Sequence, residues 1–177
     1  MTRIALLIFL LTDVATPALR PLVPTDLFQI EKIGEVVPSP DGRLLAYIRI
    51  RGKATAKFQM RDFMNGLDRA DVWVASVGGG EPRNLTGGAV DGSGWFLPAW
   101  SPDGRRLAML STRGDNVRLW VWEKASQELK RVSPEGIEIA RPVWLSRDEV
   151  LCAGVPEGRK AVTSALTRNN CYPAAIR

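Results

Sequence analysis

The sequence predicts an all-β fold, a partial β-propeller with two clear four-stranded blades, an incomplete third blade and a short leader helix. Three observations in its 177 residues support this prediction: the tetrapeptide SPDG occurs twice, an aromatic strand pair recurs 47 residues further on, and almost no segment has helical periodicity. A repeat of about 45 residues is typical of propeller blades. A single four-stranded sheet cannot bury both of its faces, so copies of it stack.

The first repeated feature is a hairpin tip. Proline at its second position presets φ, glycine at its fourth accepts the backbone as it leaves, and aspartate can bond to the local backbone. The two copies are Ser39, Pro40, Asp41 and Gly42, then Ser101, Pro102, Asp103 and Gly104. Each is followed by consecutive apolar residues, at 44–48 and 107–110, which predicts strands that are covered on both faces.

The second repeated feature is an aromatic strand, a polar turn and another strand. Residues 71–86 match 117–133, with Trp73 at the place of Trp120 and Leu85 at the place of Val132. A fainter third copy surrounds Trp144, which corresponds to Trp100, although its turn lacks proline and glycine. These tryptophans are therefore expected to pack between blades.

The repeats divide the chain into five segments. Only 25–34 has a helical pattern, with Thr25 or Asp26 as N-cap. No further aromatic strand pair follows the third copy, which suggests a chain truncated before additional blades. The segments are a signal peptide (1–18), a leader with the helix (19–34), blade 1 (35–97) with a basic insertion (51–70), blade 2 (98–141), and an incomplete blade 3 with an irregular tail (142–177).

The amino terminus has the pattern of a secretory signal. A charged start precedes eight apolar residues, 4–11, and small residues allow cleavage after Ala18. This predicts a periplasmic or secreted protein, and the apolar run is too short for a stable membrane span. The alternative is an apolar strand that packs on the propeller.

Three stretches together carry a resemblance to a known family: TDLFQIEKIGEVVPSPDGRLLAYI, DVWVASVGGGEPRNLT and PAWSPDGRRLAMLSTRGDNVRLWVWE. They resemble the amino-terminal propeller of the prolyl oligopeptidase family of serine peptidases, which includes dipeptidyl and acylaminoacyl peptidases. VLCAGVPEGR is similar to the subgroup that contains lasso-peptide isopeptidases. SPDG also occurs in the periplasmic propeller of the Tol system and in other binding propellers.

The resemblance implies a Ser-Asp-His triad, with the serine in a G-x-S-x-G turn of a carboxy-terminal hydrolase domain. This chain has no histidine, and its nearest string, DGSGW at 91–95, lacks the first glycine. We therefore predict no catalytic, cofactor-binding or metal-binding residue. Cys152 and Cys171 do not require a disulfide. The partners that the resemblance implies are the missing hydrolase domain or further blades, and a peptide substrate.

Positive charge and tryptophan offer two weaker candidate sites. Between Arg49 and Arg69 six basic residues stand against two acidic ones, within a net charge of +5. A solvated insertion explains this better than contact with an acidic substrate, and no nucleic-acid motif is present. Trp95 lies outside the repeat register, so it either packs or lines a loop at the mouth of the propeller.

Three hypotheses of function remain. The first is a non-catalytic propeller part of a prolyl-oligopeptidase-like enzyme, which would gate peptide access to a triad supplied by another segment. The second is a protein-binding propeller of the Tol type. The third is a non-functional truncated remnant. The leader helix and the basic insertion favour the first hypothesis over the second.

Overall fold

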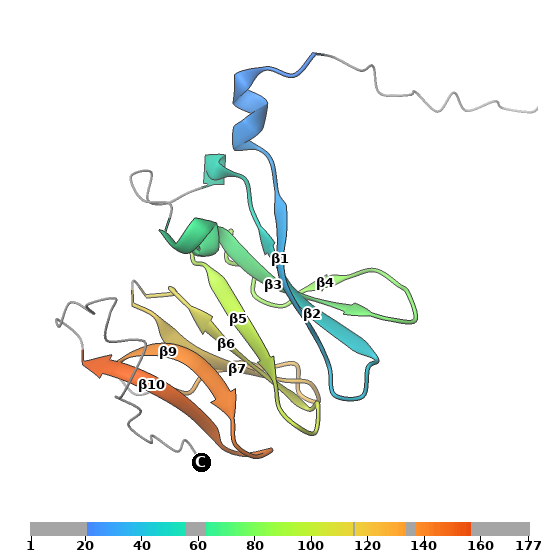
Figure 1. Cartoon of the computed structure of the whole chain (residues 1–177), viewed down its shortest axis with the longest axis vertical. Helices are drawn as coiled ribbons and strands as arrows, with labels where there is room; N and C mark the ends of the chain where they lie inside the picture. Colours follow the sequence, from blue (N-terminus) through green and yellow to red (C-terminus); the bar gives the residue numbers. More distant parts are fainter. Residues whose placement is uncertain (1–20, 56–62, 115, 134–136, 157–177) are drawn as a thin grey trace, which may run out of the picture.

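Three antiparallel sheets follow one another along the chain and stack side by side (Figure 1). The structure, a computed structural model, describes residues 21–55, 63–114, 116–133 and 137–156. Blade 1 contains β1 (Lys32–Pro38), β2 (Leu44–Ile50), β3 (Ala70–Ser76) and β4 (Arg83–Asn84). Blade 2 contains β5 (Trp95–Trp100), β6 (Arg106–Ser111), β7 (Arg118–Glu123) and β8 (Leu129–Arg131), and blade 3 contains β9 (Ile137–Trp144) and β10 (Val150–Pro156). This confirms the predicted partial propeller.

The register of the strands supports the sequence repeat. Trp73 of β3 lies opposite Tyr47 of β2, and Trp120 of β7 lies opposite Met109 of β6. In every blade the pairing of the first two strands contains a register shift, after Ile33, after Phe96 and at Cys152. Bulges of this kind increase the twist of a strand pair. The first strand also continues upstream of its bulge, so blades 2 and 3 begin at Trp95 and Ile137 rather than at 98 and 142.

The core lies between the sheets, in two layers. One layer joins blades 1 and 2 and is rich in tryptophan, while the other joins blades 2 and 3. The strand β6 contributes to both: Leu107 and Met109 face blade 1, and Ala108 and Leu110 face blade 3. These four residues of β6 are all buried, which explains why the apolar run after the second SPDG turn does not alternate with polar residues.

The blade 1 copy of this apolar run differs, because only one of its faces is covered by described residues. Ile48 of β2 is 4% exposed and faces blade 2. On the other face of blade 1, Ile33 and Val36 of β1 are 63% and 50% exposed. Blade 1 therefore presents an apolar sheet face on the side away from blade 2.

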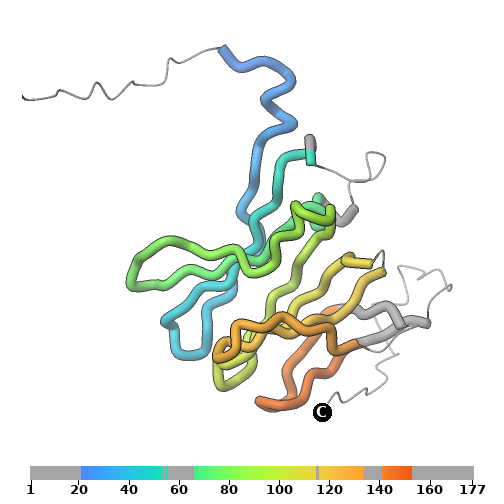
Figure 2. The backbone as a smooth tube through the Cα atoms, turned by 180° about the vertical axis from the view of Figure 1, so that it is seen from behind, coloured from blue at the N-terminus to red at the C-terminus, as the bar shows by residue number. Residues whose placement is uncertain are grey.

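Helical structure is limited to short 3-10 turns in the described residues: η1 (Pro24–Phe28), η2 (Lys53–Thr55) and η3 (Phe63–Arg69). The leader helix is thus shorter than the predicted 25–34, because β1 starts at Lys32 and pairs with β2 from there. The basic insertion contains η2 and η3, near the end of blade 1 opposite its hairpin tip (Figures 1 and 2). The predicted signal peptide and tail, at 1–18 and 157–177, lie outside the described residues.

Candidate functional site

The two SPDG segments form matching hairpin tips, at the β1–β2 and β5–β6 connections. The hydroxyl of Ser39 donates to the carboxylate of Asp41 (2.6 Å) and accepts from the N–H of Leu44 (2.9 Å), while the Gly42 N–H donates to the Ser39 carbonyl (2.9 Å). Both glycines have positive φ, 67° and 68°, which side chains disfavour. In blade 2 the Ser101 hydroxyl donates to Asp103 (2.7 Å) and accepts from the Arg106 N–H (2.9 Å), and the Gly104 N–H donates to the Ser101 carbonyl (2.9 Å).

These hydrogen bonds lower the pKa of both aspartates. The serine hydroxyl is the largest cause for Asp41 and for Asp103, and the backbone N–H of Arg43 or Arg105 is the next. Each carboxylate is therefore charged at neutral pH and directed at its own turn. A general acid or base needs a pKa near the working pH, so these groups hold the turn rather than transfer protons.

Two equivalent tryptophans connect each blade to the one before it. The indole N–H of Trp100 donates to the carbonyl of Val37 in blade 1 (3.1 Å), and that of Trp144 donates to the carbonyl of Ala99 in blade 2 (2.8 Å). The acceptors also occupy equivalent places, since Val37 pairs with Ala46 as Ala99 pairs with Ala108. We call this repeated bond the indole clamp. Blade 1 has Pro38 at the position of the clamp donor.

The other tryptophans serve packing. Trp95 is 0% exposed, donates to the Ser93 hydroxyl (2.9 Å) and meets Trp120 edge to face at 5.2 Å. The alternative that Trp95 lines an open loop is therefore wrong, because the first strand of blade 2 starts earlier than predicted and carries this residue into the core. The buried indole nitrogens of Trp73 and Trp120 have no hydrogen-bond partner in the part of the chain that the structure describes.

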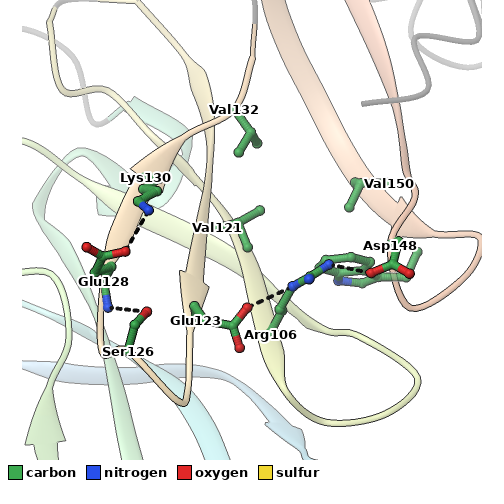
Figure 3. Close-up of a pocket in the computed structure, with 10 residues that line it drawn as sticks. Arg106, Val121, Glu123, Ser126, Glu128, Lys130, Val132, Asp148 and Val150 are labelled. Carbon is green, nitrogen blue, oxygen red and sulfur yellow. Dashed lines mark hydrogen bonds and ion pairs between the residues drawn. The ribbon is translucent and has the colours of Figure 1, made fainter. Parts of the chain in front are cut away.

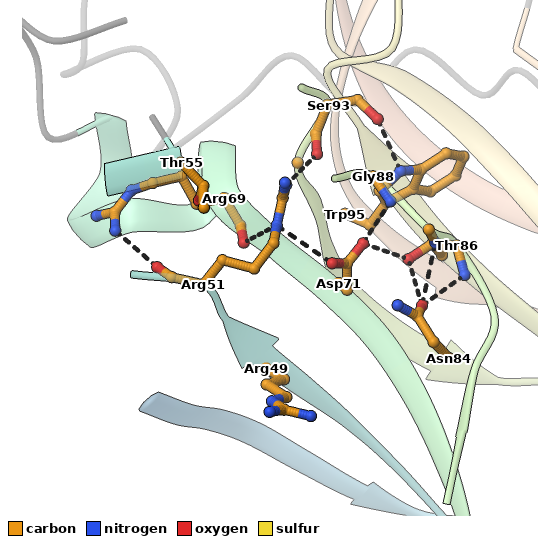
Figure 4. Close-up of polar contacts among 12 residues, drawn as sticks. Arg49, Arg51, Thr55, Arg69, Asp71, Asn84, Thr86, Gly88, Ser93 and Trp95 are labelled. Carbon is orange, nitrogen blue, oxygen red and sulfur yellow. Dashed lines mark hydrogen bonds and ion pairs between the residues drawn. The ribbon is translucent and has the colours of Figure 1, made fainter. Parts of the chain in front are cut away.

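A buried polar cluster joins blades 1 and 2 at the end that carries the insertion (Figure 4). Asp71, 2% exposed, pairs with Arg51 (3.2 Å) and accepts from the Thr86 hydroxyl (3.0 Å) and the Gly88 N–H (2.6 Å). Arg51 also donates to the carbonyl of Ser93 before β5 (2.7 Å). The cluster thus ties the two blades together through charge-assisted hydrogen bonds.

This cluster changes the interpretation of the basic insertion. Arg51 is 8% exposed and Arg69 is 6% exposed, so two of the six basic side chains between Arg49 and Arg69 lie inside the protein. The Arg69 guanidinium donates to the carbonyl of Arg51 (2.8 Å) and lies 3.8 Å from Asp68. Sequence reasoning missed this site because the interacting residues are distant along the chain. The neighbouring acidic residues at 68 and 71 were its only visible signal.

A groove of about 360 Å³ lies between blades 2 and 3 (Figure 3). Apolar side chains form its floor, and charged side chains stand along both rims. Blade 3 has two strands in the described residues, and these two strands leave the outer part of the blade 2 face uncovered. The groove is lined by Arg106, Val121, Glu123, Ser126, Glu128, Lys130, Val132, Trp144, Asp148 and Val150.

One rim of the groove is fixed by Arg106. Its guanidinium pairs with Glu123 of β7 (2.8 Å) and with Asp148 in the β9–β10 turn (2.9 Å). The hydrogen bond to Glu123 is the main reason why the pKa of Arg106 is raised, and a hydrogen bond from Arg147 is the main reason why that of Asp148 is lowered. All the charges on this rim are therefore satisfied.

The described side chains contain no arrangement for covalent or metal chemistry. Within those ranges no group of three potential metal ligands occurs, and the chain has no histidine to activate a serine. Cys152 is free and buried between blades 2 and 3, which raises the pKa of its thiol. Cys171 lies outside the described residues. No helix in the described ranges is long and apolar enough to cross a membrane.

The sheets, bulges and indole clamps together define stacked blades of a β-propeller. No family model matches the sequence. Two curated relatives do: the Tol-Pal system protein TolB of Nitratidesulfovibrio vulgaris, 29% identical over 101 residues, and the uncharacterized peptidase YuxL of Bacillus subtilis, 25% identical over 134 residues. They align with 55% and 75% of this chain. The chain spans only 21% and 19% of their lengths.

Solved structures of the same two kinds share the fold. The isopeptidase AtxE2 matches 76% of this chain with a TM-score of 0.56 and 19% identity, over 23% of its own length. A putative TolB from Agrobacterium tumefaciens matches 69% of the chain with a TM-score of 0.50 and 21% identity, over 38% of its length. The neighbours thus include peptidases of the prolyl oligopeptidase family and TolB propellers, and at these identities they show the fold alone.

Proposed function

We propose that this chain is the non-catalytic propeller part of a prolyl-oligopeptidase-like serine peptidase. In the intact enzyme the blades would gate the access of peptides to a hydrolase domain. The observation that carries the proposal is the extent of the match: the peptidase relative aligns with 75% of the chain, whereas the TolB relative aligns with 55%. The chain itself has no histidine for a triad.

The proposal is tested by reading the gene on both sides of this coding segment in all three frames. We expect further SPDG-type blades, then a G-x-S-x-G turn, then aspartate and histidine in that order. Several hundred flanking codons without this pattern in any frame would refute the peptidase origin. The partner of the chain would be that hydrolase domain, and its ligand a peptide.

A protein-binding propeller of the Tol type is the second candidate, favoured by the higher identity of the TolB relative, 29% against 25%. The two candidates differ in a binding assay with the purified chain. Saturable binding to a Pal protein, the partner named in the Tol-Pal system, would support the second candidate. Binding to a separately expressed peptidase hydrolase domain, with none to Pal, would support the first.

Both candidates fit an exported protein, and we propose that the mature chain is periplasmic or secreted and begins at Leu19. The support is the charged start, the short apolar run and the small residues before Ala18. Amino-terminal sequencing of protein recovered from the cell envelope tests this assignment. An intact Met1 in that fraction would contradict it.

A further inference from the structure

We propose that the groove between β8 and β10 is a docking site for an added β-strand that carries aromatic side chains at alternate positions. The inference is independent of the proposed peptidase origin, because it rests on the internal repeat alone. Blades 1 and 2 show what covers this place in a filled interface. The described residues of blade 3 leave the same place open (Figure 3).

The strand register identifies the equivalent positions. Val74 of β3 pairs with Arg83 of β4, as Val121 of β7 pairs with Lys130 of β8. In blade 1, Val74 is 9% exposed because it belongs to the core cluster that contains Trp122 of β7. The third strand of blade 2 therefore covers the third and fourth strands of blade 1.

At the next interface this cover is missing in the described residues. Val121 and Val132 line the open groove, with Val150 of β10 on its other side. In blades 1 and 2 the outer edge of the second strand pairs with the third strand, whereas among the described residues β10 pairs with β9 alone. An unpaired strand edge beside an apolar floor is the arrangement that accepts an extended peptide by β-augmentation.

The side chains that the groove selects follow from the filled interface. Trp122 lies opposite Leu107 and Trp120 lies opposite Met109. The corresponding positions on the open edge are Val150 and Cys152, so the added strand needs one large aromatic side chain opposite each. Val150 and Cys152 are 4% and 2% exposed and form the fixed base for these rings.

A cation marks the same position in both interfaces. The guanidinium of Arg83 lies 5.6 Å from the centre of the Trp122 ring. Lys130 occupies the equivalent place in blade 2, and its side chain is 70% exposed beside the groove. Among the described residues Lys130 forms an ion pair with Glu128, whose side chain is 55% exposed. The ammonium group is thus placed over the face of an incoming aromatic ring.

The occupant we infer is therefore an extended segment of the form aromatic–x–aromatic, running antiparallel to β10. The chain supplies a suitable probe in the sequence of its own β7–β8 hairpin, VRLWVWEKASQELKRV at 117–132. A labelled synthetic peptide of this sequence is titrated into the full chain, and the amide hydrogen exchange of the chain is measured with and without it. The control peptide has serine in place of both tryptophans.

We expect saturable binding of the tryptophan peptide, no binding of the serine peptide, and slower exchange at 150–156. The Lys130→Glu variant should bind about two- to fivefold more weakly, because it loses an exposed cation–π contact. Arg43→Glu, an equal charge change at the exposed β1–β2 tip, should bind as the parent chain does. Circular dichroism of both variants checks that each retains the parent fold.

Three results would overturn the proposal. The first is the absence of saturable binding, or equal binding of the serine peptide. The second is protection at β6 in place of β10, which would mean that the peptide displaces β7 within blade 2. The third is protection of 150–156 that appears without peptide and grows with protein concentration, which would assign the groove to a second copy of the chain.

Discussion

The indole clamp between blades can be tested by replacing tryptophan with phenylalanine at two sites that differ in one hydrogen bond. In Trp100→Phe the clamp to Val37 is lost, while in Trp120→Phe the lost N–H is buried and has no partner among the described residues. Both changes remove the same atoms, from Trp100 within the core cluster and from Trp120, which is partly buried against it. The loss of apolar area therefore cancels in part in the comparison.

The remaining difference comes from hydrogen bonding. Losing the clamp removes about 1 kcal/mol of net stabilisation, because this hydrogen bond is partly buried and water can reach the Val37 carbonyl. Removing the unpartnered N–H of Trp120 instead relieves a desolvation cost of about 1 kcal/mol or more. We expect Trp100→Phe to be less stable than Trp120→Phe by at least about 2 kcal/mol, from the sum of these effects.

Native-state hydrogen exchange is the suitable assay, because it measures local opening without requiring one cooperative transition. A difference of about 2 kcal/mol corresponds to roughly thirtyfold faster exchange of the β1 and β5 amides in Trp100→Phe. Trp144→Phe should show the matching effect in β9, where the clamp to Ala99 is lost. Equal exchange in Trp100→Phe and Trp120→Phe would refute the clamp as a stabilising contact.

Further predictions concern the polar cluster, the turns and the free chain. Asp71→Ala should cost about 3–5 kcal/mol in urea unfolding, since it leaves Arg51 buried without its carboxylate, and adding Arg51→Met should recover part of the loss. Ser101→Ala should raise the pKa of Asp103 toward its ordinary value, as measured by NMR titration. Because the folded-state pKa of Asp103 is lowered, its contribution to stability is present above its unfolded-state pKa of about 4 and is lost as pH falls through the folded-state pKa. The loss of stability caused by Ser101→Ala should therefore be smaller in acid. The purified chain should hydrolyse no peptide above background, and the exposed apolar face of blade 1 should make it associate on size-exclusion chromatography, whereas a sharply melting monomer would contradict this expectation.

The repeat in the sequence predicted much of the fold. Identical SPDG turns require identical local geometry, and the recurrence of Trp73 at Trp120 and of Trp100 at Trp144 fixed the spacing of equivalent strands. Blade boundaries were less accurate, because the bulges in the first strands let those strands run further upstream than the turn motif indicates. The helix over 25–34 was too long for the same reason, since pairing with β2 outweighs the helical pattern from Lys32 onward.

What the sequence by itself determined is local and repetitive: the hairpin tips, the strand order and the absence of a histidine for a triad all follow from nearby residues or from composition. The tertiary structure alone decided the contacts between blades. Arg51, Asp71 and Ser93 meet only because two sheets stack, and the groove beside Lys130 forms only where the described strands of blade 3 pack against blade 2. A repeat in the sequence specifies each sheet, because turns and strand pairs depend on short-range backbone geometry. Burial and ion pairing between sheets depend instead on which sheet faces are covered, and only the stacked blades decide this.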